Sequence, residues 1–288
     1  MGSNIASRQN EEYSILMLAA QRQIYSNVKT NNALIILLSI GIPLIVSIYT
    51  SLEQNFCGID STAICSFISI IALFVVLRLD FNNNNKVGKA ALIQQKFDLY
   101  VYDMSWNADM YGKEENVDED IAEYSGKICE NLEKRNSLLD WYVGKISTNN
   151  GYKNIYRCQK QNLSWDYDLR SDYEKYCMYI LGAILVLLIA WGLYYNLSVR
   201  KWICIVSYYM PLIVSLIRAI KRIENDKRTL LSIKQTLDAT KKLCMHRLEI
   251  VQREIYEHRK KCFLIPDRIY NFLKNKQEKK QKRLTLLN

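Results

Sequence analysis

The chain has 288 residues and a formal net charge of +10, with 39 lysines and arginines against 29 acidic residues. Eight cysteines form no C-x-x-C pair, and the only two histidines, His246 and His258, lie twelve positions apart. This pattern excludes a disulfide framework and a helical zinc pair, so we expect no metal and no cofactor. The apolar residues gather in a few stretches, which points to a membrane protein rather than a soluble one.

The chain begins with a polar segment, residues 1–32, that we expect to form a cytosolic amphipathic helix. Ile15, Leu18 and Tyr25 recur within it at helical spacing. A secretory signal peptide would have its apolar region nearer the start, so this segment is expected to be retained.

Four stretches that are almost free of charge follow. A membrane-spanning helix needs roughly 20 residues; the first and third stretches have this length, and the second and fourth reach it only with their flanks. Charged side chains interrupt none of the four apolar cores, which disfavours buried helices of a soluble protein. The predicted spans are 33–52 and 62–79, forming a first hairpin (33–79), and 177–197 and 202–220, forming a second hairpin (177–220).

The region between the hairpins, residues 80–176, is expected to be cytosolic and helical. Ala90, Ile93 and Phe97 form part of an apolar stripe with the period of an α-helix. The four asparagines at 82–85 predict a loop directly after the second span.

The last segment, residues 221–288, is predicted to be one long helix followed by a basic tail. Apolar residues recur every seven positions, which indicates a helix that continues to about Phe263 and packs as a coiled coil or bundle. These residues are Ile223, Leu230, Leu237, Cys244 and Val251. No alternating strand pattern occurs, so the predicted fold class is all-α: four transmembrane helices and a helical cytosolic bundle.

Charge next to the spans predicts the orientation in the membrane. Residues 51–61 carry Glu53 and Asp60 and no base, whereas residues 218–288 carry 20 bases and 8 acids. Because basic flanks stay in the cytosol, both termini are expected there. Arg200 and Lys201, in the short turn of the second hairpin, oppose this orientation.

The first and fourth spans share the pattern Ser-x-x-x-Pro-Leu-Ile-Val-Ser, with spacings of four that place three residues on one helix face. Two interpretations stay open: close packing inside a helix bundle, or the lining of a pore in an oligomer. The residues are Ser39, Pro43 and Ser47 in the first span, and Ser207, Pro211 and Ser215 in the fourth.

Two polar segments that lead into spans carry candidate ligand-binding residues. Arginine can bind phosphate, while aromatic and amide side chains can stack on bases and hydrogen-bond them. The alternative is that Arg22 and Arg170 form structural ion pairs with nearby aspartates. The candidates are Gln21, Arg22 and Tyr25 before the first span, and Asn162, Trp165, Arg170 and Tyr173 before the third. Helical spacing predicts that the two faces converge, within a subunit or across an oligomer interface.

Several of these residues belong to motifs that resemble the SMODS-associated four-transmembrane effector family, and the resemblance covers nearly the whole chain. The motifs are Arg8-Gln9-Asn10-Glu11, Leu18-Ala19-Ala20-Gln21-Arg22, Trp106-Asn107, Cys158-Gln159 with Asn162, Trp165-Asp166 and Leu169-Arg170, and Pro266-Asp267 with Tyr270.

The resemblance implies a multi-pass protein of the bacterial inner membrane that acts in antiphage defence. A linked nucleotidyltransferase would make a cyclic di- or trinucleotide, and the effector, as a homo-oligomer, would respond by disrupting the lipid bilayer and causing abortive infection. The chain has no phosphate-cradling glycine loop and no nucleophile elbow, so we expect neither an enzyme nor a DNA- or RNA-binding protein. The alternative is a non-conducting membrane scaffold or regulator whose helical cytosolic region binds protein partners.

Overall fold

The computed structural model describes residues 5–42, 45, 61–142, 151–239 and 243–273, and all secondary structure within these residues is helical. The all-α prediction is therefore confirmed for this part of the chain. The elements are α1 (Ile5–Arg8), α2 (Glu12–Ile36), the π-helical turn η1 (Leu37–Gly41), α4 (Ser61–Tyr102), α5 (Ala108–Tyr111), α6 (Glu114–Cys129), α7 (Leu132–Asn136), α8 (Gly151–Tyr194), α9 (Val199–Asp238) and α10 (Met245–Lys261).

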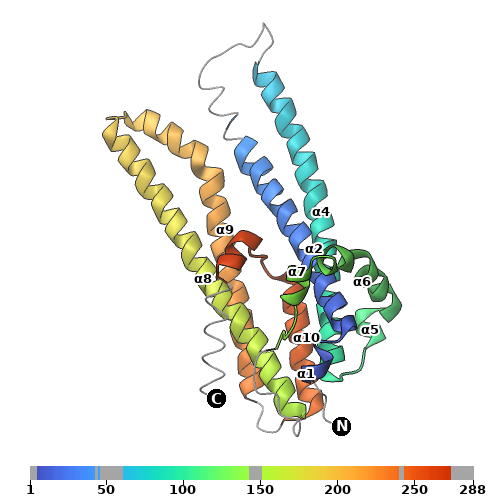
Figure 1. The fold of residues 1–288 in the computed structure, drawn as a ribbon. Coiled ribbons are helices and arrows are strands. Elements are labelled where there is room, and N and C mark those ends of the chain that lie inside the picture. The colour runs from blue at the N-terminus through green and yellow to red at the C-terminus, as the bar shows by residue number, and fades with distance from the viewer. Residues whose placement is uncertain (1–4, 43–44, 46–60, 143–150, 240–242, 274–288) are drawn as a thin grey trace.

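Four long helices form two hairpins that rise side by side from a polar base: α2 with η1 packs against α4, and α8 packs against α9 (Figure 1). The longest, α8, has 44 residues and so extends about 66 Å at a rise of 1.5 Å per residue. Each predicted boundary between a cytosolic segment and a span falls inside one of these continuous helices. The boundaries are changes in side-chain character, with no break in the backbone.

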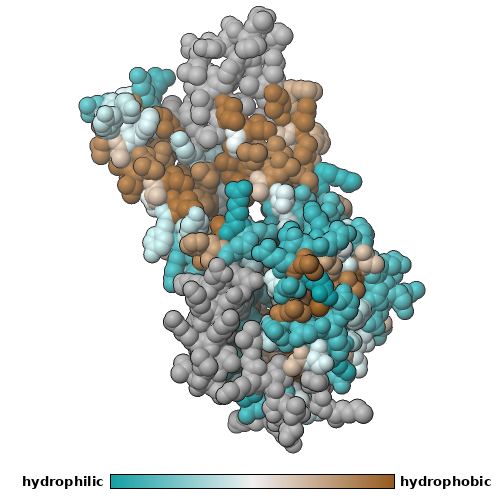
Figure 2. Space-filling view, viewed as in Figure 1, coloured by the Kyte–Doolittle hydropathy of each residue, from teal (hydrophilic) through white to brown (hydrophobic). Residues whose placement is uncertain are grey.

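Apolar side chains cover one end of the molecule and polar side chains the other (Figure 2). By length and composition, α8 is the one described helix that could cross a membrane by itself, and the two bent parts of α9 would make a second span. In the first predicted span, Pro43 and Ser47 lie outside the described residues.

Helix α9 bends by 52° between its parts Val199–Ser207 and Tyr209–Asp238. Pro211 lies just beyond the bend, and a proline ring inside a helix clashes with the carbonyl four positions earlier, here that of Ser207, which accounts for the bend. The side chains of Ser207 and Pro211 are exposed and that of Ser215 is half-buried, and Ser39 in η1 is also exposed. This face of α9 is thus not buried inside the single chain.

The predicted loop at residues 82–85 is wrong, because α4 continues through all four asparagines. Asn83 is buried, accepts a hydrogen bond from Asn31 Nδ2 (2.9 Å) and donates one to Asn32 Oδ1 (2.9 Å). These bonds to α2 favour the helical conformation despite the low helix propensity of asparagine.

The predicted continuous helix to about Phe263 is also wrong. Helix α9 ends at Asp238, and the chain turns back so that α10 runs beside α9 and α4 toward the apolar end (Figure 1). Leu230 and Leu237 of α9 and Leu248 and Val251 of α10 all belong to the main core. A seven-residue apolar repeat is buried equally well by one helix or by two packed antiparallel, so the repeat did not reveal the turn.

Candidate functional site

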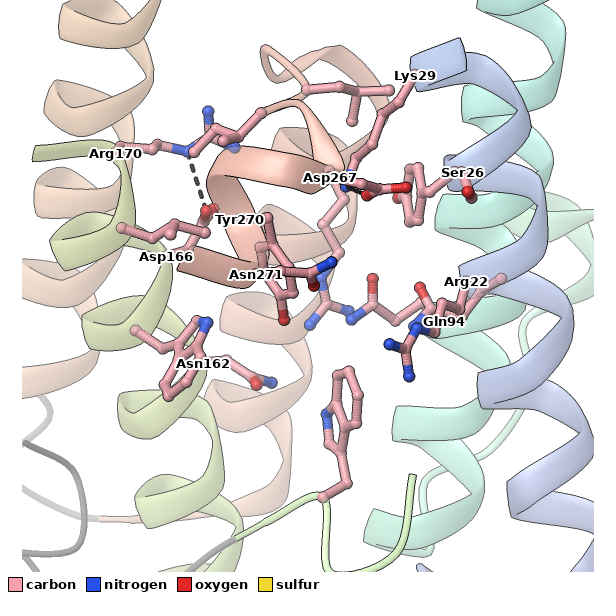
Figure 3. A pocket seen from close by; sticks show the side chains of 18 of the residues that line it. Arg22, Ser26, Lys29, Gln94, Asn162, Asp166, Arg170, Asp267, Tyr270 and Asn271 are labelled. Atoms are coloured by element: carbon pink, nitrogen blue, oxygen red, sulfur yellow. Dashed lines mark hydrogen bonds and ion pairs between the residues drawn. The ribbon is translucent and has the colours of Figure 1, made fainter. Parts of the chain in front are cut away.

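A cavity of about 840 Å³ lies in the polar half of the molecule, between the lower parts of α2 and α8 (Figure 3). Its walls come mainly from α2, α8, α10, the segment after α7 and residues 263–271, with single residues from α4, α6, α7 and α9. Pockets that bind small molecules have volumes of roughly 300–1,000 Å³, so the cavity can hold a ligand of drug or dinucleotide size.

The structure brings six of the seven predicted ligand residues to this cavity: Gln21, Arg22, Tyr25, Asn162, Trp165 and Arg170. Figure 3 shows Arg22 on α2 and Asn162 on α8 pointing into the space between the two helices. The two polar segments therefore converge within one subunit. Their binding of a ligand stays a prediction.

Tyr173 does not line the cavity. It is 8% exposed and stacks on Phe263, with ring centroids 6.0 Å apart. Together with Leu169 and Ile265 it belongs to a small core cluster that joins α8 to the segment after α10. Tyr173 lies one helical turn beyond Leu169 and was therefore predicted on the same face of α8 as the other candidates. The segment after α10 packs on this part of the face and covers it.

Arg170 lines the cavity but is already engaged with two carboxylates. Its side chain is 4% exposed, with Nε 3.0 Å from Asp166 Oδ1 and Nη1 2.7 Å from Asp226 Oδ2. Nη1 also donates to the backbone oxygen of Phe263 (2.9 Å). These contacts match the alternative interpretation, in which Arg170 forms structural ion pairs, and leave it little capacity for a ligand phosphate.

Asp166 is ionised as a consequence of this arrangement. Its burial alone would raise the pKa of the carboxyl group, but the charge of Arg170 and the contact with His258 hold that pKa well below its usual range. His258 Nε2 lies 3.3 Å from Asp166 Oδ2. The α8 side of the cavity is therefore close to neutral in charge.

Basic side chains without a carboxylate partner lie on the side of the cavity opposite α8, on α2 and α7. Lys29 pairs with Asp267 (2.7 Å) and Arg259 with Asp98 (2.6 Å), whereas Arg22 and Lys134 have no carboxylate within 4.0 Å among the described residues. Arg22 Nη1 donates to Ser137 Oγ (2.7 Å), which in turn donates to the backbone oxygen of Lys134 (2.6 Å). A guanidinium, an ammonium and a hydroxyl thus share one end of the cavity, and this combination suits a phosphate.

The rest of the lining is aromatic and amide-rich. Burial raises the pKa of Tyr25, so its hydroxyl stays protonated and can act as a hydrogen-bond donor. Sequence reasoning missed several lining residues because they come from segments with no polar motif of their own. These are Gln94 of α4, Lys134, Ser137 and Trp141 from α7 and the segment after it, and Asn271 near the end of the described chain.

Trp141 is held in the cavity wall by the N-terminal motif. Asp140 has a left-handed backbone (φ 52°), and Asn10 clamps it by donating to its carboxylate and accepting from its backbone N–H, both at 2.9 Å. Two residues after Asp140, the backbone N–H of Tyr142 donates to Gln9 Oε1 (2.8 Å). Gln9 and Asn10 therefore support the site from a distance instead of touching a ligand.

A buried polar network fixes the floor of the cavity. Asp98 is fully buried and accepts hydrogen bonds from Tyr142, from Gln252 (2.8 Å) and from Arg259 (2.6 Å). Asn162 Nδ2 donates to the Tyr142 hydroxyl (3.1 Å) and so connects the cavity to this network. Because each of these contacts restricts a side chain, the cavity is largely formed before any ligand arrives.

The short helix at residues 267–273 closes the cavity on the side of the apolar end. Asp267, Tyr270 and Asn271 line the cavity, and Figure 3 shows Tyr270 and Asn271 directed into it. Arg268 and Phe272 lie on the opposite face of the same helix and line a separate groove against α8. The ion pair between Asp267 and Lys29 connects this helix to α2.

Fold and cavity together define an all-helical protein in which two apolar-tipped hairpins stand on a polar base that contains a ligand-sized, partly cationic cavity. The chain belongs to the SMODS-associating 4TM effector domain family, whose sequence model matches residues 3–285. It is 31% identical over 198 residues to a probable CBASS effector molecule of Bacillus cereus strain VD146. That similarity covers 68% of this chain and 65% of the relative. No solved structure matches the chain.

Proposed function

We propose that the chain is a membrane-disrupting effector of bacterial antiphage defence that is activated by a cyclic oligonucleotide. Membership of a four-transmembrane effector family and similarity to a probable CBASS effector support the defence role. CBASS effectors respond to cyclic oligonucleotides made by a linked nucleotidyltransferase, which would be the functional partner of this chain. The proposal requires no catalysis by the chain itself.

The observation that carries this proposal is the position of the cavity. Arg22 lies on α2, which leads into the first predicted span, and Asn162 and Trp165 lie on α8, which leads into the third. A ligand in the cavity would therefore touch the roots of both hairpins at once.

The ligand would bind through its phosphates and its bases. A phosphate would sit at Arg22, Lys134 and Ser137, where unpaired positive charge is available, and bases would stack on Trp141 or Trp165. Binding shifts an equilibrium only through different affinities for two states. We propose that the activated state holds α2 and α8 closer together and thereby moves the attached spans.

The exposed serine–proline face of α9 is the proposed lining of the leak. Ser207 and Pro211 are not covered within the single chain, so a pathway would form where several subunits meet as a homo-oligomer. We further propose insertion in the bacterial inner membrane with both termini in the cytosol. The polar end of the molecule, which contains α1 and the cavity, would then face the compartment in which the nucleotide is made.

Dye release from liposomes tests this proposal. Protein reconstituted in vesicles of bacterial phospholipids should release a trapped dye when a matching cyclic di- or trinucleotide is added, and the double variant Arg22→Ala/Lys134→Ala should not respond. The matched control, Lys113→Ala/Arg228→Ala, removes the same charge from exposed positions away from the cavity and should respond normally. Nucleotide binding without any leakage would instead favour the non-conducting scaffold.

A further inference from the structure

A second hollow of about 510 Å³ lies outside the cavity, between α8 and the helix at residues 267–273. Its wall includes Lys175, Tyr176 and Tyr179 of α8 and Arg268 and Phe272 of the short helix.

The groove straddles the level at which α8 turns apolar. Lys175 and Tyr176 directly precede the predicted start of the third span at Cys177, and Tyr179 follows it by two residues. Tyrosine is enriched at the level of lipid headgroups, because its ring favours the apolar side and its hydroxyl the wet side. If α8 spans a bilayer, the groove therefore lies at the level of the cytosolic lipid headgroups.

Two aromatic side chains that line this groove are largely exposed to solvent. Tyr179 is 76% exposed and Phe272 is 79% exposed. The two residues come from different elements and both line the same hollow, so exposed aromatic side chains of both elements face it. Such a surface at the membrane border is suited to the first carbons of an acyl chain.

The charge of the groove favours an anion. Lys175 and Arg268 are exposed, and neither has a carboxylate within 4.0 Å among the residues that the structure describes. Asp172 is the one acidic residue in the lining.

We propose that this groove binds the headgroup of an anionic phospholipid. Lys175 and Arg268 hold the phosphate, and Tyr179 and Phe272 contact the start of the acyl chains. The site requires that α8 crosses the bilayer, but it does not require that the cavity binds a nucleotide.

Native mass spectrometry tests the proposal. The full chain is released from nanodiscs that contain equal amounts of phosphatidylglycerol and phosphatidylcholine. The wild type should retain phosphatidylglycerol in preference to phosphatidylcholine. Lys175→Ala/Arg268→Ala should lower that preference about fivefold or more for each base removed, as expected for basic residues near an anionic surface. Phe272→Ala should lower the retention of both lipids.

The control variant is Lys113→Ala/Lys127→Ala, which removes two exposed bases around α6 and should keep the preference. Equal retention of the two lipids by the wild type, or an unchanged preference in the double variant, overturns the proposal. Displacement of the lipid by millimolar glycerol phosphate also overturns it, because the groove would then be a site for a soluble phosphate. Nucleotide binding by Lys175→Ala/Arg268→Ala should be unchanged, so a loss of lipid preference in this variant is distinguishable from a failure of the nucleotide cavity.

Discussion

Arg170 Nη1 lies 2.7 Å from Asp226 Oδ2 and ties α8 to α9 below their apolar parts. The same Asp226 oxygen accepts a hydrogen bond from the backbone N–H of Phe263 (2.8 Å), so one carboxylate joins three segments. Lys227 and Glu174 form a second ion pair one turn away on the same two helices. The root of the second hairpin is thus held by a small cluster of paired charges.

Removing one member of this cluster should destabilise the fold. Arg170→Ala leaves Asp166 and Asp226 without their main partner in a mostly buried place, and such a loss typically costs about 3–5 kcal/mol. Thermal unfolding in mild detergent measures the effect. Arg228→Ala, at a 74% exposed i,i+4 pair, should stay within about 0.5 kcal/mol of wild type. Similar melting of both variants would contradict the structural role of Arg170.

Arg22 is expected to behave in the opposite way. Arg22 is half-buried, and its guanidinium donates a hydrogen bond to the exposed Ser137, so Arg22→Ala should melt close to wild type. Affinity for the activating cyclic nucleotide should fall by about 1.5–3 kcal/mol, the contribution of a hydrogen bond to a charged group. Isothermal titration calorimetry measures this change. Arg22→Lys is the comparison, because lysine keeps the positive charge but lacks the planar guanidinium that can bind phosphate with two hydrogen bonds. Wild-type affinity in Arg22→Ala would remove it from the site.

The asparagine run offers a matched pair of substitutions. Asn83→Ala should destabilise the first hairpin by about 1–3 kcal/mol, because the half-buried side chains of Asn31 and Asn32 lose their buried partner. Asn84→Ala alters an exposed neighbour and should be neutral or slightly stabilising, since alanine is the better helix former. Chemical denaturation followed by circular dichroism compares the two. A larger loss for Asn84→Ala would mean that the pairing with α2 is wrong.

Gly192 of α8 lies directly against Trp202 of α9 in the second hairpin. A Cβ atom there would lie 2.4 Å from the Trp202 ring, which donates its N–H to the Leu188 oxygen (3.1 Å). Gly192→Ala should therefore displace the indole and destabilise the hairpin by about 1–3 kcal/mol. Gly182→Ala, on the same helix with nothing within 4 Å, is the control and should be tolerated. Thermal melting in detergent distinguishes them, and equal tolerance would refute the contact.

Stability should also fall at acidic pH through Asp166. Burial opposes its ionisation, but Arg170 and His258 lower its pKa further than burial raises it. A carboxyl group with a depressed pKa stabilises the fold at pH values above about 3.9, its ordinary pKa, and this contribution is lost as the pH falls from there toward the folded-state pKa. Melting temperatures of wild type and Asp166→Asn between pH 5 and 2.5 check this. The loss should be smaller in Asp166→Asn, and parallel curves would contradict the assignment.

The sequence predicts the hairpins and the convergence of two polar segments because those features are local. Gln21 with Tyr25, and Asn162 with Trp165, share helix faces by spacing alone, and α2 and α8 were expected to lead into spans. The contributions of Lys134 and Trp141 were not predictable in this way, since their placement depends on Asn10 clamping Asp140 from 130 positions away. The helical asparagine run and the turn after α9 were missed for the same reason: partners distant in the chain determine both.

The helix at residues 267–273 presents Tyr270 and Asn271 to the cavity and Arg268 and Phe272 to the groove on the membrane border. One short helix thus belongs to both proposed sites, so a shift of this helix moves a wall of each. By thermodynamic reciprocity, any factor by which the nucleotide changes lipid affinity equals the factor by which the lipid changes nucleotide affinity. The nucleotide concentration needed to trigger the protein would therefore depend on the anionic lipid content of the membrane around it.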